Sequence, residues 1–404
     1  MQKKIKFSMV SETDIRYGGG TEKTLLNFFK YLDREKVEPF IFDTNVLDKE
    51  RLSDNELKIY YSLDTTIKFR YPEFISNLLR NKKMGLSVQK KKISKDLFLI
   101  YSILIKFAFL RIFNRDAYKR LMESDVIYAV SDYQLIYLFI NKLFKKKYPI
   151  IIFGTHNYLP IERRIINKFE NLLLKKITEA THYTSIAIYN LSNIKRKDDF
   201  IINSGVNTSI FYPSKNSSGK IKFLFVGRLV EYKGIKELIQ AWKLFNHKEN
   251  AELHIVGTGE LEDYVIEESK NDESIHFYGF VKEDELPLIY RECHILVFPT
   301  YGIKHDEYFG LVVIEALASG EYVILSEEMK GIFDYFNEKN ALEYVKLDPK
   351  IISERMEFAF KNIENLKKNV LDVRKYIEEN YDWKNISLKL SEKIYEIYLN
   401  YKKD

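Results

Sequence analysis

The feature that most constrains the fold is a repeated order of short apolar strand, glycine-containing loop and helix. Residues 222–226 form an apolar run that ends at Gly227, and a helix is expected at residues 235–244. Residues 253–256 form a second such run, which ends at Gly257. Because parallel strands are joined through crossover connections that are usually helices, this order predicts a doubly wound α/β domain. Ligands of such domains bind beyond the carboxyl ends of the strands.

The second half continues this order. Strands are expected at residues 275–278, 294–298 and 323–325, and helices at residues 284–291 and 311–319. The second half therefore contains the elements of a whole doubly wound domain.

The first half shows the same organisation less clearly. Residues 5–10 alternate weakly as a strand, three glycines end at Gly20, and residues 21–32 carry apolar side chains at helical spacing. Further short strands are expected at residues 39–42, 126–130 and 149–153. A chain of 404 residues is too long for one ordinary core and suits two domains of roughly 150–200 residues each.

A linker separates the two halves. Asn203, Ser204, Gly205 and Pro213 lie close together, and such a density of these residue types marks a linker. We therefore expect two domains, over residues 1–200 and residues 201–380, followed by a further segment over residues 381–404.

The N-terminus and the cysteine content indicate the compartment. Residues 1–14 contain neither a long apolar stretch nor a small-residue cleavage site, so no secretory signal is expected. The single cysteine, Cys293, excludes an internal disulfide and a multi-cysteine metal site. The apolar stretch at residues 97–113 is broken by Lys106 and Arg111 and is shorter than the roughly 20 residues that span a bilayer. We expect a cytoplasmic protein with a buried or interfacial helix.

Clusters of lysine leave two interpretations open. Six lysines lie between residues 82 and 95, and three more occupy residues 145–147. Beside the apolar stretch, these charges would place the chain peripherally on the cytoplasmic face of an anionic membrane. The alternative is a solvated basic loop beside an ordinary packed helix. A nucleic-acid partner would rest on the lysines alone, without a matching motif, and is not expected.

Two segments at strand ends carry charges that suit a nucleotide sugar. Arg228 and Lys233 follow one strand and precede a helix, where they can meet at a diphosphate. Gly310 opens another helix, whose free N–H groups and positive dipole end suit a phosphate. Glu307 precedes that helix and Glu315 lies within it, and two such carboxylates suit the hydroxyls of a sugar and a ribose. Each segment alone is also compatible with ordinary surface charge.

Together these segments resemble the retaining glycosyltransferases of the GT-B fold, the fourth family of the usual classification. The matching motifs are Gly18-Gly19-Gly20-Thr21-Glu22, Ile202-Asn203-Ser204-Gly205-Val206-Asn207, Val226-Gly227-Arg228-Leu229 with Lys233-Gly234, Ile255-Val256-Gly257-Thr258-Gly259, and Glu307 to Glu315 with E-x7-E spacing. Their joint order and spacing are specific and cover nearly the whole chain. The resemblance implies two Rossmann-like doubly wound domains that face each other across a cleft, and an enzyme of the EC 2.4 hexosyltransferase class. It also implies that residues 1–200 form the acceptor-side domain, that residues 201–380 form the nucleotide-sugar-binding domain, and that a helix over residues 381–404 packs back on the N-terminal domain.

The resemblance also implies roles for single residues. Arg228 and Lys233 would hold the donor diphosphate and stabilise it as a leaving group. Glu307 would contact the transferred sugar, and Glu315 the ribose hydroxyls. The rest of the donor site would come from Gly19, Gly20, Gly227, Gly257, Phe280, Val281, Phe309, Gly310 and Leu311. Phe280 and Val281 belong to the segment that resembles the family's nucleobase contact.

His156 is the candidate catalytic residue of the first half. It follows an apolar strand, and its position resembles that of the family's histidine near the reacting sugar. We expect it to hydrogen-bond the sugar or to help position the acceptor. The alternative is a surface histidine or a satisfied core histidine.

The mechanism that follows is charge stabilisation more than proton chemistry. Negative charge on the departing diphosphate would be neutralised by the two cations and the helix start. The sequence lacks an Asp-x-Asp metal signature, and the cations would replace a divalent ion. We therefore expect no metal and no cofactor, with the nucleoside diphosphate sugar as co-substrate and with retention of the anomeric configuration.

Three departures from the family pattern lie near this site. After Gly320 the family usually has a proline before a valine, where this chain has Glu321-Tyr322-Val323. Tyr308 occupies a position that is often glycine, and Asp334 ends a shortened loop in place of a glutamate. These changes leave the expected reaction type unaltered and put the sugar specificity in question.

The expected function is metal-independent, retaining transfer of a sugar from a nucleoside diphosphate sugar to a glycan or lipid-linked acceptor, as in glycan biosynthesis. A catalytically silent nucleotide-sugar-binding subunit is one alternative, and the joint presence of Arg228, Lys233, Glu307 and Glu315 argues against it. A GT-B-fold sugar-nucleotide isomerase is the other. A phosphorylase would need a cofactor lysine, and nothing in the sequence marks one.

Overall fold

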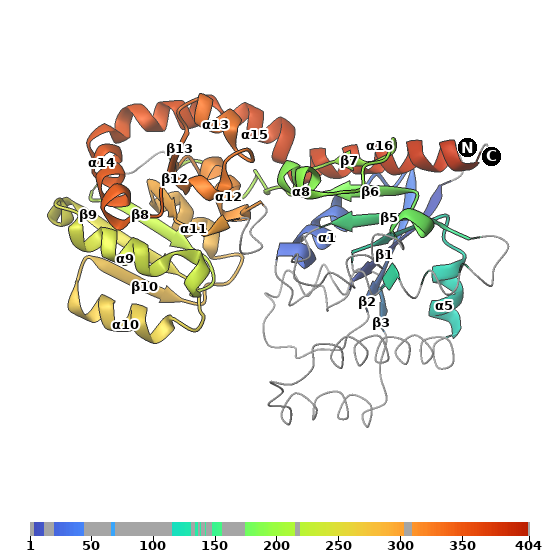
Figure 1. Cartoon of the computed structure of the whole chain (residues 1–404), viewed down its shortest axis with the longest axis horizontal. Coiled ribbons are helices and arrows are strands. Elements are labelled where there is room, and N and C mark those ends of the chain that lie inside the picture. The colour runs from blue at the N-terminus through green and yellow to red at the C-terminus, as the bar shows by residue number, and fades with distance from the viewer. Residues whose placement is uncertain are drawn as a thin grey trace, which may run out of the picture. The chain divides into compact units, whose positions relative to one another are not determined.

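The computed structural model divides the chain into two compact units (Figure 1), each described here by itself. It describes residues 4–11, 20–43, 66–68, 115–130, 134, 135, 138, 142, 148–155, 174–214, 219–302 and 309–402. Unit 1 comprises Met1–Tyr183, Asn193–Phe200 and Ser387–Asp404, and unit 2 comprises Thr184–Ser192 and Ile201–Ile386.

Unit 1 is built on a sheet whose strand order is β3-β2-β1-β4-β5-β6-β7. Its strands are β1 (Ile5–Ser11), β2 (Val37–Asp43), β3 (Thr66–Lys68), β4 (Val126–Ala129), β5 (Ile150–Thr155), β6 (Ala180–Tyr183) and β7 (Phe200–Ile201), and its described helices include α1 (Gly20–Tyr31) and α5 (Arg115–Met122). Neighbouring strands from β3 to β6 run parallel. The predicted strands of the first half correspond to β1, β2, β4 and β5, and the Rossmann-like fold is confirmed.

Strand β6 has no counterpart among the predicted strands, because Thr181 and His182 interrupt its apolar pattern. Both side chains are nevertheless buried. The Nδ1 atom of His182 lies 2.6 Å from the hydroxyl of Tyr128, and its ring stacks on Phe200 with 4.9 Å between the centroids. Burial raises the pKa of Tyr128 well above its ordinary value. The phenol therefore stays neutral and satisfies the buried imidazole.

Unit 2 is built on a second parallel sheet, ordered β10-β9-β8-β11-β12-β13. Its strands are β8 (Ile221–Val226), β9 (Ala251–Val256), β10 (Ile275–Gly279), β11 (Ile295–Phe298), β12 (Tyr322–Ser326) and β13 (Leu342–Val345). The strand order reverses between β8 and β11. Such a switch point is where open α/β sheets bind their ligands.

The helices of unit 2 precede, connect or follow these strands. They are α8 (Ile186–Leu191), α9 (Ile235–Leu244), α10 (Glu262–Asn271), α11 (Leu286–Glu292), α12 (Leu311–Ser319), α13 (Asp334–Glu338), α14 (Pro349–Asp372) and α15 (Arg374–Tyr381), with 3₁₀ turns at η2 (Glu231–Lys233), η3 (Lys248–Asn250) and η5 (Glu327–Met329). Figure 1 shows α9 and α10 beside strands β8 to β10. The predicted helices at residues 235–244 and 311–319 have the same bounds as α9 and α12.

The packing of α9 closes one face of the second sheet. Trp242 of α9 is fully buried, and its ring lies 5.6 Å from that of Phe223 in an edge-on contact. Its indole N–H donates to the hydroxyl of Ser274 at 3.0 Å. The one polar atom of this side chain is thus satisfied, as burial of an indole requires. Phe223 points to this face, so its neighbours along β8 point to the opposite face.

Helix α16 (Trp383–Lys402) begins in unit 2 and continues into unit 1. Trp383 donates its backbone N–H to Val206 O at 3.1 Å within unit 2. Further along, the hydroxyl of Ser391 accepts a hydrogen bond from the backbone N–H of Asp33 at 2.9 Å within unit 1. Leu390 is fully buried. Residues 387–402 are therefore part of the core of unit 1.

Within the part of the chain that the structure describes, no helix has the length and apolar character needed to cross a membrane. The lysines between residues 82 and 95, those at residues 145–147 and the apolar stretch at residues 97–113 all lie outside the described residues. The peripheral-membrane interpretation therefore stays a prediction.

Candidate functional site

The loops that follow β8, β9 and β10 are hydrogen-bonded to one another. Leu229 donates its backbone N–H to Thr258 O at 2.9 Å, and Gly257 donates to Gly279 O at 2.8 Å. Because parallel strands end at one edge of the sheet, these bonds join the predicted donor-binding loops into a continuous rim. The rim carries Gly227, Gly257, Phe280 and Val281 from the predicted site.

Two glycines allow the backbone segments of this rim to approach closely. Gly257 has a φ of +136°, and a Cβ atom there would lie 1.8 Å from the carbonyl oxygen of Gly227. Gly234 has a φ of +73°, and its Cβ would lie 1.8 Å from the carbonyl oxygen of Pro299. A side chain at either position would push the loops apart. Gly234 thereby joins the loop after β8 to the loop after β11.

Arg228 and Lys233 both lie against Tyr232. The exposed guanidinium of Arg228 donates to the Tyr232 hydroxyl and lies 5.6 Å from the centre of its ring. The ammonium of Lys233 lies 5.7 Å from the same ring and 5.0 Å from the ring of Phe298 at the end of β11. Aromatic faces attract cations. Tyr232 and Phe298, which the sequence did not single out, therefore hold the two predicted diphosphate ligands near each other.

Burial and a neighbouring cation disfavour the charged form of Lys233. Burial, and then repulsion by Arg228, lowers the pKa of Lys233 to about 7. A diphosphate bound beside the two cations would supply negative charge and would favour the protonated ammonium. A bound diphosphate would thus raise the pKa of Lys233 and offset the repulsion between the two cations.

The start of α12 and the ammonium of Lys233 both lie beside the ring of Phe298. Gly310, with a φ of +69°, is the N-cap of α12, and a Cβ there would lie 3.3 Å from the edge of the Phe298 ring. Because glycine has no side chain, it provides no side-chain cap to the first-turn N–H groups, of which that of Val313 donates to the Gly310 carbonyl oxygen at 3.0 Å. The helix start and Lys233 thus both lie against Phe298, and the phosphate contact expected at such a helix start stays a prediction.

Glu315 lies in the second turn of α12 and is 3% exposed. Its Oε2 atom accepts a hydrogen bond from the hydroxyl of Tyr290 at 3.1 Å. Tyr290 is fully buried, and burial followed by the charge of Glu315 raises its pKa well above the ordinary value. The phenol therefore keeps its proton and orients the carboxylate. The contact of Glu315 with a ribose stays a prediction.

The segment after β10 presents an aromatic ring to solvent. Phe280 is 64% exposed, while Val281 packs against the core of unit 2. Gly279, with a φ of +64°, provides the turn between them and β10. An exposed ring held by an anchored neighbour suits stacking on a planar base.

The first residues of the α12 segment are anchored in the core. Phe309 is 8% exposed, and its ring lies 5.4 Å from that of Phe333. Leu311 is partly buried and packs against the same core. Their side chains therefore fix the backbone that was predicted to contact phosphate.

Two of the departures from the family pattern have definite structural surroundings. Glu321 is fully buried, and neither of its carboxyl oxygens has a hydrogen-bond partner among the described residues. Asp334 lies at the start of α13, where its Oδ1 atom accepts from the Gly331 N–H and the Tyr344 hydroxyl, each at 2.9 Å. Asp334 therefore braces the shortened loop.

Five other residues that the sequence singled out do not belong to the described part of unit 2. Glu307, Tyr308, His156 and Gly19 lie outside the described residues. Gly20 is the first residue of α1 in unit 1. The roles predicted for these residues stay predictions.

The candidate site lies within a segment that matches a known family. Residues 207–379 match the family described as Glycosyl transferases group 1. Over this segment the chain is similar to the group 1 glycosyltransferases. The matched segment includes Arg228, Lys233, Gly310 and Glu315, so the family predicted from the motifs is confirmed.

Individual group 1 relatives are similar over parts of the chain. An uncharacterised glycosyltransferase of Methanocaldococcus jannaschii is 26% identical over 55% of this chain and 59% of its own length. The capsular polysaccharide biosynthesis glycosyltransferase CapM of Staphylococcus aureus is 32% identical over 39% of this chain and 41% of its own length. The chain thus spans less than two thirds of the length of these curated relatives.

A solved structure supports the fold over nearly the whole chain. HepE of Anabaena, crystallised with UDP and glucose, superposes with a TM-score of 0.67 at 14% sequence identity and covers 96% of this chain and 99% of its own. At this identity the likeness establishes the fold alone. It confirms the expectation of two Rossmann-like domains of the GT-B type.

Proposed function

We propose that this group 1 glycosyltransferase moves a hexosyl group from a nucleoside diphosphate sugar to a glycan or lipid-linked acceptor. The observation that carries the proposal is the placement of Arg228 and Lys233 on Tyr232, with Phe298 linking Lys233 to the open start of α12. Two cations and a helix N-terminus at the carboxyl-terminal edge of one sheet suit a diphosphate.

These groups account for the departure of the diphosphate. As the bond between the sugar and the phosphate breaks, negative charge grows on the leaving diphosphate, and the two cations and the helix start stabilise it. Arg228 offers a planar set of donors, and Lys233 a compact charge. We propose that the charges of Arg228 and Lys233 replace a metal ion and that the anomeric configuration of the sugar is retained, as the resemblance of the motifs implies.

The relatives support the class of substrate. HepE was crystallised with UDP and glucose, and CapM is named for capsular polysaccharide biosynthesis. For this chain we propose a nucleotide-sugar donor and a role in glycan biosynthesis on the cytoplasmic side, with peripheral contact to an anionic membrane and without a nucleic-acid partner. Glu307 and His156 complete the proposed catalytic set.

A donor screen tests the proposal. The protein is incubated with a panel of nucleoside diphosphate sugars, and both thermal stabilisation and release of nucleoside diphosphate are measured. Lys233→Met is compared with Lys236→Met, a matched control whose ammonium pairs with Glu231 at 2.9 Å on the surface. We expect Lys233→Met to lower turnover by about 10²–10³-fold, and Lys236→Met to behave as the native protein.

The outcomes separate the alternatives. Failure of every donor to bind or to turn over, or full activity in Arg228→Ala, would refute the proposal. Binding without turnover would instead indicate a silent nucleotide-sugar-binding subunit. Addition of a chelator should leave turnover intact, and a loss would overturn the metal-free part of the mechanism.

A further inference from the structure

The edge of the second sheet carries polar side chains where a buried parallel strand would carry apolar ones. Strand β9 reads Ala-Glu-Leu-His-Ile-Val, so Glu252 and His254 point to the same face, opposite the face covered by α9. His276 of the edge strand β10 is in register with His254. Parallel strands covered on both faces are usually continuously apolar, so three polar side chains at these positions call for a functional explanation.

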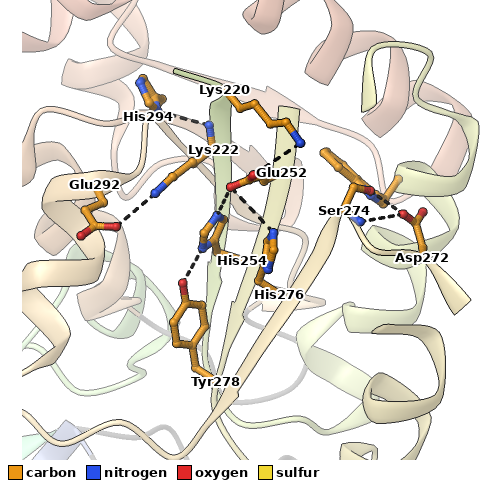
Figure 2. A network of polar contacts seen from close by, with 11 residues as sticks. Lys220, Lys222, Glu252, His254, Asp272, Ser274, His276, Tyr278, Glu292 and His294 are labelled. Carbon is orange, nitrogen blue, oxygen red and sulfur yellow. Dashed lines mark hydrogen bonds and ion pairs between the residues drawn. The ribbon is translucent and has the colours of Figure 1, made fainter. Parts of the chain in front are cut away.

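The three side chains converge on one point (Figure 2). The Oε2 atom of Glu252 lies 3.2 Å from Nε2 of His254 and 3.7 Å from Nε2 of His276. The potential ligand atoms of the three residues all lie within 4.8 Å of one another. A tetrahedral zinc ion with bonds of about 2.0–2.2 Å separates its ligand atoms by about 3.4 Å. The two separations from the Glu252 oxygen, 3.2 Å and 3.7 Å, are close to this value.

We propose that Glu252, His254 and His276 form a binding site for a divalent transition-metal ion of the zinc class, separate from the donor site. Two imidazole nitrogens and one carboxylate oxygen are a donor set that such ions accept, with a fourth position left for water. The side chain of His276 is 43% exposed, whereas that of His254 is 6% exposed. The ion therefore enters from the solvent side, past His276.

Neighbouring groups orient the ligands. The Nδ1 atom of His254 lies 2.8 Å from the hydroxyl of Tyr278, which leaves Nε2 directed at the metal position, as in many protein metal sites. The other carboxylate oxygen of Glu252 faces Lys220 at 3.6 Å, while Lys222 pairs with Glu292 at 3.1 Å. Figure 2 shows these contacts around the cluster. Lys220 is long and half-exposed, so it can move into water when a cation binds.

The position of the site gives the metal a structural effect. It would link β9 to β10, the edge strand, through three side chains. Metal binding that occurs only in the folded state stabilises that state. Bound metal should therefore slow amide hydrogen exchange in Ile275–Gly279 of β10.

Direct titration tests the proposal independently of any transferase activity. The chelator-treated protein, with any affinity tag removed, is titrated with zinc chloride, and cobalt(II) chloride is used as a spectroscopic probe of coordination number. Glu252→Gln and His276→Gln are compared with His247→Gln, a control at a histidine outside the cluster, which lies 3.9 Å from the carboxylate of Glu249. Circular dichroism confirms that each variant is folded.

We expect one equivalent of zinc to bind and to slow exchange in β10. Glu252→Gln and His276→Gln should each weaken binding by at least about tenfold, and His247→Gln should bind as the native protein does. Cobalt should give the intense visible absorption of a four-coordinate site. Absence of binding in the native protein, or equal affinity in all four proteins, would overturn the proposal.

Discussion

Replacing Glu321 by leucine should stabilise unit 2, because the native carboxyl group is fully buried and has no hydrogen-bond partner among the described residues. A buried polar group without a partner costs about 1–3 kcal/mol. Leucine has a similar volume, so the change in packing should cost less than about 1.5 kcal/mol. We therefore expect Glu321→Leu to raise the free energy of unfolding by about 1–2 kcal/mol near neutral pH.

The effect should depend on pH in a defined direction. Burial raises the pKa of Glu321 well above its ordinary value of 4.5, and the charge of Lys367 opposes this only in part. In the unfolded chain the group ionises near 4.5, so folding takes up a proton between that pH and the raised pKa. The free energy of unfolding should therefore fall by about 1.4 kcal/mol per pH unit across this window.

Urea unfolding followed by tryptophan fluorescence measures this directly. The chain has two tryptophans, Trp242 and Trp383, and both belong to unit 2. The native protein is compared with Glu321→Gln, which removes the titration, and with Glu354→Gln on the exposed surface of α14 as a matched control. The stability difference between the native protein and Glu321→Gln should widen as the pH rises from about 5 to 6. Parallel pH profiles for these two proteins would refute the reasoning.

Three further predictions concern the candidate donor site. Because the pKa of Lys233 is held at about 7, binding of a nucleoside diphosphate at about pH 8 should take up nearly one proton. Calorimetry in two buffers should show that Lys233→Met abolishes this uptake, and equal uptake in both proteins would contradict the assignment. Gly234→Ala should lower the free energy of unfolding by about 1–3 kcal/mol, since its Cβ would lie 1.8 Å from the Pro299 oxygen; an unchanged melting temperature would argue against this. Tyr290→Phe removes the donor to Glu315 and should cost about 1–3 kcal/mol of stability, together with weaker donor binding. Urea unfolding and donor titration check both effects, and native values in both would show that the bond is dispensable.

The regular parts of unit 2 could be predicted because their signals are local. Helices α9 and α12 each begin directly after a glycine, Gly234 or Gly310, and both were predicted with their observed bounds. Strand β13 was not predicted, because Glu343 makes its sequence look polar. The carboxylate of Glu343 instead pairs with Arg355 of α14, a contact between residues that are distant in the sequence.

Around the two cations, the sequence predicted Arg228 and Lys233 but not the rings of Tyr232 and Phe298 against which they lie. Arg228 and Lys233 lie in a recognisable motif after β8, whereas Tyr232 gains its role from tertiary contacts. Its backbone oxygen accepts the N–H of Tyr301 at 2.8 Å, which joins η2 to the loop after β11. The metal cluster was likewise hidden, because only the parallel register of β9 and β10 brings His276 beside His254.

The passage of α16 from unit 2 into unit 1 has a consequence for synthesis on the ribosome. Residues 201–386, which form most of unit 2, emerge before residues 387–402, which unit 1 needs for its core. Until residues 387–402 have emerged, the part of unit 1 that Leu390 and Ser391 of α16 contact stays uncovered. During synthesis, unit 2 could therefore complete its fold before unit 1, although most of unit 1 is made earlier. A nascent chain stalled before residue 387 would then carry a folded group 1 domain and an incomplete N-terminal domain.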